Sequence, residues 1–360
     1  MSSNSAAVLY AARDLRISEW EVPQPAPHEV RIRMRNVGIC GSDVHYWWHG
    51  HCGPFILRDA MVIGHECAGV VEAVGSAVRD RSVGQRVAVE PGVPCGRCGQ
   101  CRGGRYNLCG RMQFMATPPV HGALARYVCH AADFCYPLPD GLTLEEGALC
   151  EPLSVAVHAN DRAGTRVQSR VVVLGAGPIG LACLMVAKAY GAVPVVVTDV
   201  SEQRLQVARY HCGADAVVCV REDRSEAETV KAVRQALGGD ADGGDVGADA
   251  VIDCCGAEST MRVALQVAAS GGRVCLVGMA QDEMRLPLVA ASTREVDVVG
   301  VFRYRNTYPR CIGLLASGKL NARALITHRL KGLDAQQLLQ GFEMARTGAD
   351  GAIKVMFDVE

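Results

Sequence analysis

Four cysteines stand close together in the spacing Cys95-x2-Cys98-x2-Cys101-x7-Cys109. Four thiolates complete a tetrahedral shell around a zinc ion and leave no position for a substrate, which is typical of a structural zinc site. Iron–sulfur ligation is the chemical alternative, because four cysteines also hold such clusters. The spacing, with a proline and several glycines nearby to supply turns, favours structural zinc.

A second set of metal-ligating residue types is dispersed: Cys40, then His65 and Glu66, then Glu151. Catalytic zinc takes few protein ligands and keeps an open position, which a cysteine, a histidine and a carboxylate can provide. A thiolate and one carboxylate would neutralise the ion and leave a Lewis acid of moderate strength. Neighbours on a regular strand point to opposite faces, so His65 and Glu66 can both ligate only at a turn.

The glycine pattern Gly175-Ala176-Gly177-Pro178-Ile179-Gly180 directly follows an apolar run and opens a helical stretch. This context is typical of a dinucleotide-binding fingerprint. Gly175 permits the tight turn, Gly177 lets the backbone approach the pyrophosphate, and Gly180 allows close packing of helix and strand. The helix N-terminus then offers unpaired N–H groups to the phosphates.

Asp199 ends the next predicted strand. A carboxylate there accepts hydrogen bonds from the adenosine ribose and repels a 2′-phosphate, which favours NAD over NADP. Arg204 follows five residues later and argues for NADP instead, since a guanidinium can hold the 2′-phosphate.

The elements that carry these residues fall into two patterns. Up to about residue 150 the chain predicts short strands with Gly/Pro punctuation, such as Leu15–Val22, Glu29–Ile39, Gly69–Val74 and Gln85–Val89. From Arg170 onward, predicted strands alternate with helices, which indicates a parallel doubly wound sheet. Its strands are predicted at Arg170–Leu174, Pro194–Asp199, Ala216–Val220, Ala248–Asp253, Arg273–Val277 and Val296–Phe302, with helices at Ile179–Tyr190 and Glu202–His211. The stretch Gly238–Gly247 is predicted to be a solvated loop.

Composition limits the class of protein. The 360 residues contain 37 Lys and Arg against 38 Asp and Glu, and this balance disfavours a nucleic-acid partner. Long apolar runs and an export signal are not apparent, so we expect a cytoplasmic protein without a membrane partner. Most of the 17 cysteines lie scattered in apolar segments, as reduced thiols do in the cytosol.

Several segments resemble the zinc-containing medium-chain dehydrogenases. They are Gly38–Asp43, Gly64–Glu72, Cys95–Cys109 and the glycine fingerprint. Further segments are similar to sorbitol dehydrogenases and their xylitol and arabinitol relatives: Ala116–Pro119, Phe134–Tyr136, Glu145–Leu149, Glu151–Val155 and Val301–Tyr304. The likeness covers nearly the whole chain.

The resemblance implies an α/β fold with a Rossmann doubly wound parallel sheet and a mostly β GroES-like catalytic domain. The catalytic domain would occupy residues 1–155, the NAD-binding domain residues 156–300, and residues 301–360 would return to complete the catalytic domain. Two zinc ions per subunit, NAD and a homotetramer are implied as well.

By the same resemblance, Cys40, His65 and Glu66 would hold the catalytic zinc, and Cys95, Cys98, Cys101 and Cys109 the structural zinc. Glu151 stands where alcohol-oxidising relatives carry a second cysteine ligand, so Glu66 and Glu151 both remain candidates for the third ligand, and Cys150 is a more distant one. The cofactor would contact Gly175, Gly177, Ile179, Gly180, Asp199, Arg204, Val277, Gly278 and Met279. The polyol would contact Tyr46, Phe114, Glu151, Arg303 and Tyr304.

The expected reaction oxidises a secondary hydroxyl of a polyol to the ketose, with hydride transfer to NAD. Glu151, Ser42 and His45 would carry the proton away. A zinc threonine or alcohol dehydrogenase is the alternative within enzymes, and a non-catalytic structural protein of the same fold is the alternative outside them. His45, His49, His51 and Cys52 together suggest a further metal site, but a loop at the pocket lip is the preferred interpretation.

Overall fold

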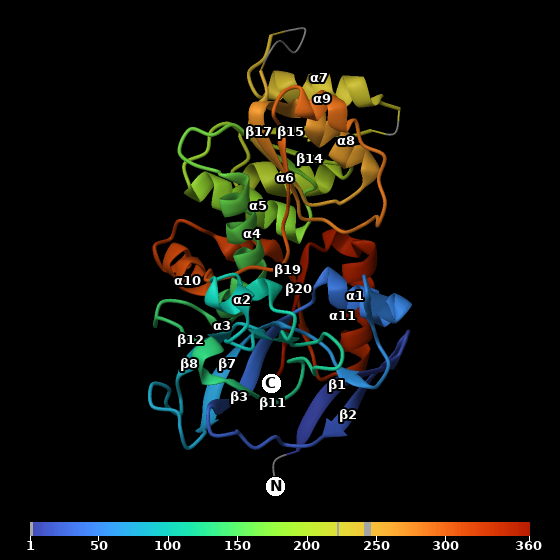
Figure 1. The fold of residues 1–360 in the computed structure, drawn as a ribbon. Helices are drawn as coiled ribbons and strands as arrows, with labels where there is room; N and C mark the ends of the chain where they lie inside the picture. The colour runs from blue at the N-terminus through green and yellow to red at the C-terminus, as the bar shows by residue number, and fades with distance from the viewer. Residues whose placement is uncertain (1–2, 222, 241–245) are drawn as a thin grey trace. The chain divides into compact units, whose positions relative to one another are not determined.

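The computed structural model describes residues 3–221, 223–240 and 246–360, and it divides into two compact units (Figure 1). The first unit contains Met1–Glu151, Tyr308–Ser317 and Ile326–Glu360, and the second contains Pro152–Thr307 and Gly318–Leu325. Of the predicted loop 238–247, residues 241–245 lie outside the described residues. None of the described helices is long and apolar enough to cross a membrane.

The first unit is built on a largely antiparallel sheet in the order β12-β8-β7-β3-β20-β19, with β11 also paired to β3. The strands are β3 (Glu29–Gly38), β7 (Glu66–Val74), β8 (Arg86–Val89), β11 (Tyr127–Ala131), β12 (Cys135–Pro137), β19 (Ile326–Lys331) and β20 (Lys354–Asp358). The central strand β3 pairs with β7 from the early chain and with β20 from its end. The two ends of the chain therefore meet in one sheet.

A smaller sheet and several short elements complete the first unit. The sheet has the order β2-β1-β6, formed by β2 (Asp14–Trp20), β1 (Asn4–Ala11) and β6 (Met61–Val62). Short strands are β4 (His51–Cys52), β5 (Phe55–Ile56), β9 (Gly92–Val93) and β10 (Gln113–Phe114). The helices are α1 (Gly41–His49), α2 (Gly99–Arg102), α3 (Leu144–Ala148), α10 (Tyr308–Ala316) and α11 (Ala335–Thr347).

Helix α11 packs along β19 and β20 and also contacts α1 (Figure 1). Phe342 of α11 lies with its ring centroid 5.6 Å from that of Trp47 in α1, and it stacks on Phe357 of β20. These three rings belong to the buried core of the unit. Aromatic side chains of this size contribute strongly to core stability.

The second unit is a parallel sheet in the order β15-β14-β13-β16-β17-β18. Its strands are β13 (Val171–Leu174), β14 (Val195–Asp199), β15 (Ala216–Cys219), β16 (Ala248–Asp253), β17 (Ala268–Leu276) and β18 (Asp297–Gly300). Its helices are α4 (Cys150–Ala163), α5 (Pro178–Ala189), α6 (Glu202–Tyr210), α7 (Glu226–Ala236), α8 (Glu258–Val267) and α9 (Leu288–Ser292). The first two residues of α4, Cys150 and Glu151, still belong to the first unit. The order reverses between β13 and β16, which is the switch point of a Rossmann fold.

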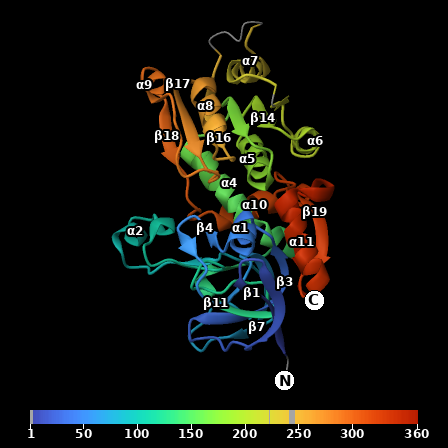
Figure 2. The same cartoon turned by 90° about the vertical axis from the view of Figure 1, so that its right-hand side faces the viewer.

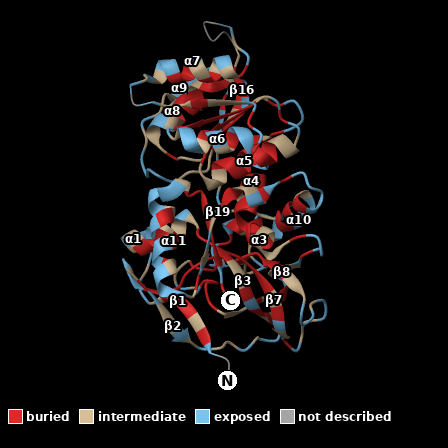
Figure 3. Cartoon of the chain, turned by 180° about the vertical axis from the view of Figure 1, so that it is seen from behind, coloured by how far each residue is buried: buried red, intermediate tan, exposed pale blue. Residues whose placement is uncertain are grey.

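Burial explains why these segments form parallel strands. All of β13 is buried, as expected for a valine-rich strand that is covered on both faces. Helix α5 is buried along most of its length and drawn red in Figure 3, whereas α6 exposes one face. Helix α8 packs on β16 and β17 (Figure 2).

Two local features differ from the sequence-based expectation. Strand β17 begins at Ala268 rather than Arg273, because a register shift between Ala248 and Ala250 of β16 lets the glycine-containing segment join the sheet. Strand β18 covers Asp297–Gly300 and is therefore shorter than the predicted Val296–Phe302.

Candidate metal and cofactor sites

Cys40, His65 and Glu66 come together in the first unit, and their ligand atoms all lie within 4.8 Å of one another. Cys40 directly precedes α1, and Glu66 is the first residue of β7. Gly64 has φ of 91°, so the chain turns immediately before His65 and Glu66. Both side chains can therefore approach one point, as joint ligation requires.

Asp43 organises this cluster and had no role in the sequence-based prediction. Its Oδ2 accepts the Cys40 N–H at 3.0 Å, and its Oδ1 accepts the Gly64 N–H at 3.3 Å. The same Oδ1 lies 3.3 Å from His65 Nδ1. A carboxylate beside one ring nitrogen of a histidine orients the imidazole so that the other ring nitrogen can bind the metal.

The charged groups around His65 counteract the effect of burial on the pKa of its imidazole. Burial alone lowers the pKa of His65, but the nearby Asp43 and Cys40 raise it well above its ordinary value. His65 and Glu66 are both buried, at 5% and 0% exposure. A buried cluster rich in negative charge fits a divalent cation better than it fits solvent.

Lys354, on β20, is the buried cation already beside this cluster. Its Nζ donates to Glu66 Oε1 at 2.6 Å, to Glu66 Oε2 at 2.7 Å and to the Ile39 carbonyl at 2.9 Å. The sequence-based prediction did not single it out.

Glu151 and Cys150 lie at the start of α4, and both are buried. The gathered group of Cys40, His65 and Glu66 does not include either of them. Burial, with Cys311 and Glu146 nearby, raises the pKa of Cys150 well above its ordinary value. The geometry therefore supports Glu66 as the third ligand.

The four cysteines of the second cluster also converge, with all four Sγ atoms within 4.8 Å of one another. The Sγ of Cys98 lies 3.4 Å from that of Cys101 and 3.9 Å from that of Cys109. Tetrahedral ligands at zinc–sulfur bonding distance stand about 3.8 Å apart, so the spacing suits a single ion rather than a cluster. Backbone N–H groups of Arg97 and Cys98 lower the pKa of Cys95 to about 5, which favours its metal-ligating thiolate.

The glycine fingerprint in the second unit forms the turn between β13 and α5. Gly175 has φ of 96°, and a Cβ on Gly180 would lie only 1.7 Å from the Gly175 carbonyl oxygen. A Cβ on Gly177 would meet nothing within 4 Å, so the space beside it is open. Asp199 accepts the Ala176 N–H at 2.7 Å and the Ser201 N–H at 2.8 Å, which places its carboxylate against the fingerprint.

The remaining predicted cofactor and substrate residues are distributed over both units. Ile179 lies in the first turn of α5, and Arg204 in the first turn of α6, where the Ser201 hydroxyl accepts the Arg204 N–H. Val277, Gly278 and Met279 follow β17. Arg303 and Tyr304 lie in the second unit, while Tyr46, Phe114 and Glu151 lie in the first. The Phe114 ring centroid is 5.7 Å from that of His65.

Comparison with known proteins agrees with this geometry. Residues 26–140 match the alcohol dehydrogenase GroES-like domain, and residues 178–317 match the zinc-binding dehydrogenase domain. The chain is 48% identical to a sorbitol dehydrogenase of Arabidopsis thaliana over 99% of its length and 95% of the relative's. It is 45% identical to an L-idonate 5-dehydrogenase of Vitis vinifera, with the same coverage.

Among solved structures, an oxidoreductase of unknown specificity from Escherichia coli superimposes with a TM-score of 0.91 at 37% identity, covering both chains fully. The chain belongs to the zinc-containing medium-chain dehydrogenase family. The predicted fold class, a Rossmann sheet with a GroES-like domain, is confirmed.

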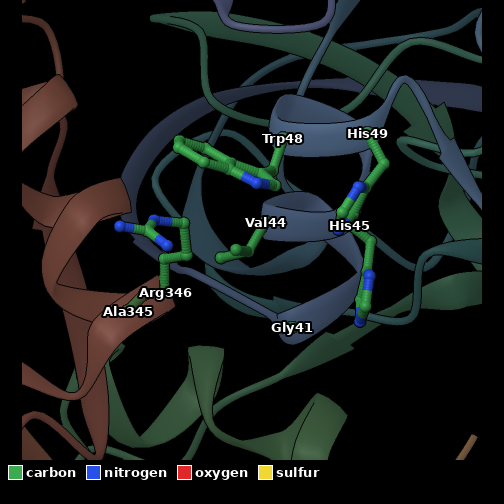
Figure 4. Close-up of a pocket in the computed structure, with 7 residues that line it drawn as sticks. All are labelled: Gly41, Val44, His45, Trp48, His49, Ala345 and Arg346. Atoms are coloured by element: carbon green, nitrogen blue, oxygen red, sulfur yellow. The ribbon is translucent and has the colours of Figure 1, made fainter. Parts of the chain in front are cut away.

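One pocket of this medium-chain dehydrogenase lies between α1 and α11 in the first unit and has a volume of about 320 Å³ (Figure 4). Figure 4 shows His45 and His49 on one side of α1, while Trp48 and Arg346 face each other on the other. The Arg346 guanidinium lies 4.1 Å from the Trp48 ring centroid. Partial burial, with His49 and His51 nearby, lowers the pKa of His45, so its imidazole is neutral at pH 7.

The predicted loop is largely the helix α1, which contains His45 and His49, and the strand β4, which contains His51 and Cys52; these histidines do not form a further metal group. His45 and His49 stack with centroids 5.8 Å apart, and His51 follows at 6.1 Å from His49. Within the described part of the chain, ligand atoms gather closely at the two clusters above and not here.

Proposed function

We propose that this chain oxidises a secondary hydroxyl of a polyol, of the sorbitol, xylitol or L-arabinitol type, to the ketose and transfers the hydride to NAD. The observation that carries the proposal is the Cys40–His65–Glu66 group, with His65 and Glu66 buried and Cys40 partly buried, and with Asp43 bonded beside it. Curated relatives named sorbitol dehydrogenase, at 48% identity over nearly the whole chain, support the substrate class.

In the first unit, Cys40, His65 and Glu66 hold the catalytic zinc, and Glu66 rather than Glu151 is the third ligand. When bound, this ion supplies a Lewis acid that makes the substrate hydroxyl more acidic. Glu151, buried near the cluster, accepts a hydrogen bond from that hydroxyl. Ser42 and the neutral imidazole of His45, on α1, pass the released proton toward solvent.

By the family resemblance, Tyr46, Phe114, Arg303 and Tyr304 contact the polyol. Pairing buried polar groups with neighbouring hydroxyls rejects simple alcohols, because those would leave the groups unpaired.

In the second unit, the fingerprint glycines bind the pyrophosphate, and Ile179 and Val277–Met279 contact the cofactor. The buried carboxylate of Asp199 selects NAD, since it accepts the ribose hydroxyls and repels a 2′-phosphate. Arg204 also contacts the cofactor, as the resemblance implies. We accordingly place cofactor binding within residues 156–300, and catalysis within residues 1–155 completed by the part of 301–360 that belongs to the first unit, namely Tyr308–Ser317 and Ile326–Glu360.

Two zinc ions per subunit follow from the two clusters. Metal analysis of the purified protein should give two equivalents, falling to one in Cys40→Ser and to one in Cys98→Ser. Cys129→Ser, outside both clusters, is the matched control and should keep two.

The family resemblance further supports a cytoplasmic homotetramer, which light scattering and fractionation would test.

The deciding experiment follows NADH formation on sorbitol, xylitol, L-arabinitol, ribitol, threonine and ethanol, before and after zinc is removed with a chelator. Chelator-sensitive activity confined to the polyols supports the proposal and ranks the substrates. Activity on threonine or ethanol alone would make the chain a threonine or alcohol dehydrogenase. Inactivity on every substrate would favour a non-catalytic protein of the same fold.

A further inference from the structure

Lys354 is the most deeply buried cation beside the catalytic cluster. It begins β20, a strand between β3 and β19, and is only 2% exposed. An ammonium group has three hydrogens to donate. Here they face three acceptors: the two oxygens of Glu66 and the carbonyl of Ile39.

The acceptor carboxylate is the one that the metal would use. Glu66 is 0% exposed, and one of its oxygens lies within 4.8 Å of the Cys40 and His65 ligand atoms. A Cβ built on Gly38 would stand 2.3 Å from Glu66 Oε2, so the carboxylate lies directly over that glycine. Its position is thus fixed by backbone on one side and by Lys354 on the other.

The hydrogen bonds show that Lys354 is in its ammonium form. Its Nζ donates to all three of these acceptors, which takes the three hydrogens of a charged lysine. Its positive charge therefore offsets buried negative charge in the same place where a zinc ion would do so. Two cations that share one carboxylate repel each other, and in a buried site this repulsion is weakly screened.

We infer that Lys354 is a positioning residue for the zinc ligand Glu66, and that its charge limits how tightly the catalytic site binds zinc. This inference rests on the proposed function. Without metal, Lys354 keeps Glu66 paired and in place, so the site stays formed. With metal, Lys354 competes for the same carboxylate and weakens zinc binding.

The test compares Lys354→Met, which keeps side-chain length without the charge, with Lys354→Arg, which keeps the charge. Lys188→Met is the matched control, because Lys188 pairs with Asp215 in the second unit, whereas both clusters belong to the first. Zinc affinity is measured by competition with a chromophoric chelator, and melting temperature is measured with and without zinc. The zinc equivalent missing from Cys40→Ser identifies the catalytic site.

We expect Lys354→Met to bind the catalytic zinc about tenfold more tightly or better, because a repelling charge has been removed. Its metal-free form should melt lower than the wild type, since Glu66 is then buried without its partner, and zinc should raise its melting temperature more than it raises that of the wild type. Lys354→Arg and Lys188→Met should match the wild type in affinity.

If zinc raises the melting temperature equally in wild type and Lys354→Met, and both bind zinc with equal affinity, the inference is overturned. Lys354 is then only a structural ion-pair partner of Glu66. If Lys354→Met does not fold even with zinc, Lys354→Gln replaces it and must show the same change in affinity. A wild type that lacks the zinc equivalent assigned to Cys40 would instead refute the proposed function.

Discussion

Asp43 touches the backbone of Cys40 and of Gly64 and lies against His65. It thereby links the start of α1 to the turn before β7, although it is not a ligand itself. Because Asp43 is only 1% exposed, removing its charge leaves those N–H groups and the imidazole without a strong acceptor.

We predict that Asp43→Asn lowers zinc affinity or turnover by about 10- to 100-fold, the usual cost of losing a group that orients a metal ligand. Metal analysis and NADH formation measure the two effects. Asp140→Asn, at a fully exposed carboxylate, is the control and should change neither. A wild-type zinc content and turnover in Asp43→Asn would show that the geometry of His65 does not depend on this carboxylate.

His130 makes stability depend on pH. It is buried with Nε2 2.8 Å from the Glu90 carbonyl oxygen, and burial lowers its pKa to about 4. Below its ordinary pKa of about 6.5 the unfolded chain takes up a proton that the folded chain refuses. Stability is therefore complete above that pH and declines as pH falls toward 4.

Urea unfolding at pH 7.5 and at pH 5.5 should show a lower midpoint at the acid pH. His130→Gln should lose part of this difference, at up to about 1.4 kcal/mol per unit of pH over that interval. His28→Gln, at an exposed histidine, should keep the wild-type difference. An unchanged pH dependence in His130→Gln would mean that other groups are responsible.

The turn between β13 and α5 contains two glycines with different constraints. Gly180 packs against the backbone of Gly175, whereas Gly177 faces open space. The constraint on Gly180 comes from the backbone of the protein itself. A constraint on Gly177 would arise only when a pyrophosphate occupies the open space beside it.

We predict that Gly177→Ala keeps the wild-type melting temperature but weakens NADH binding by about tenfold or more, because its methyl group occupies the path of the phosphates. Gly180→Ala should instead destabilise the protein by about 2 kcal/mol, as overpacking does. Calorimetry and NADH fluorescence titration separate the two. Equal NADH affinity in Gly177→Ala and wild type would place the phosphates elsewhere.

Local signals explain which elements could be predicted from the sequence. Strand β16 lies at the predicted Ala248–Asp253, and β13 and α5 begin within one residue of their predicted starts, because apolar runs and the glycine turn are short-range features. The four-cysteine group and Cys40, His65 and Glu66 are recognisable by residue type. Lys354 and Asp43 were missed because their importance comes from partners distant in the sequence, and a lone charge within Ala352–Phe357 carries no motif.

The whole molecule contains three tryptophans, Trp20, Trp47 and Trp48, and all lie in the first unit. The fingerprint and Asp199 lie in the second unit. Tryptophan emission and NADH binding therefore report on different units of the same chain.

We predict that deleting residues 354–360 shifts tryptophan emission to longer wavelength, since β3 loses β20 and Phe342 loses Phe357. NADH binding should persist, because the second unit keeps its own core. Deleting Glu360 alone, an exposed residue, should alter neither signal. Simultaneous loss of both signals in the longer deletion would show that the units do not fold separately.

The pairing of β20 with β3 also has a consequence for biosynthesis. Lys354 is translated 288 residues after Glu66, so the strand that fixes this carboxylate leaves the ribosome long after the carboxylate itself. During that interval a nascent chain carries Cys40, His65 and Glu66 without Lys354 and the sheet around it. The catalytic centre can be completed only once β20 has been made, so a premature stop codon just before residue 354 would deprive the site of Lys354 just as one much earlier in the message would.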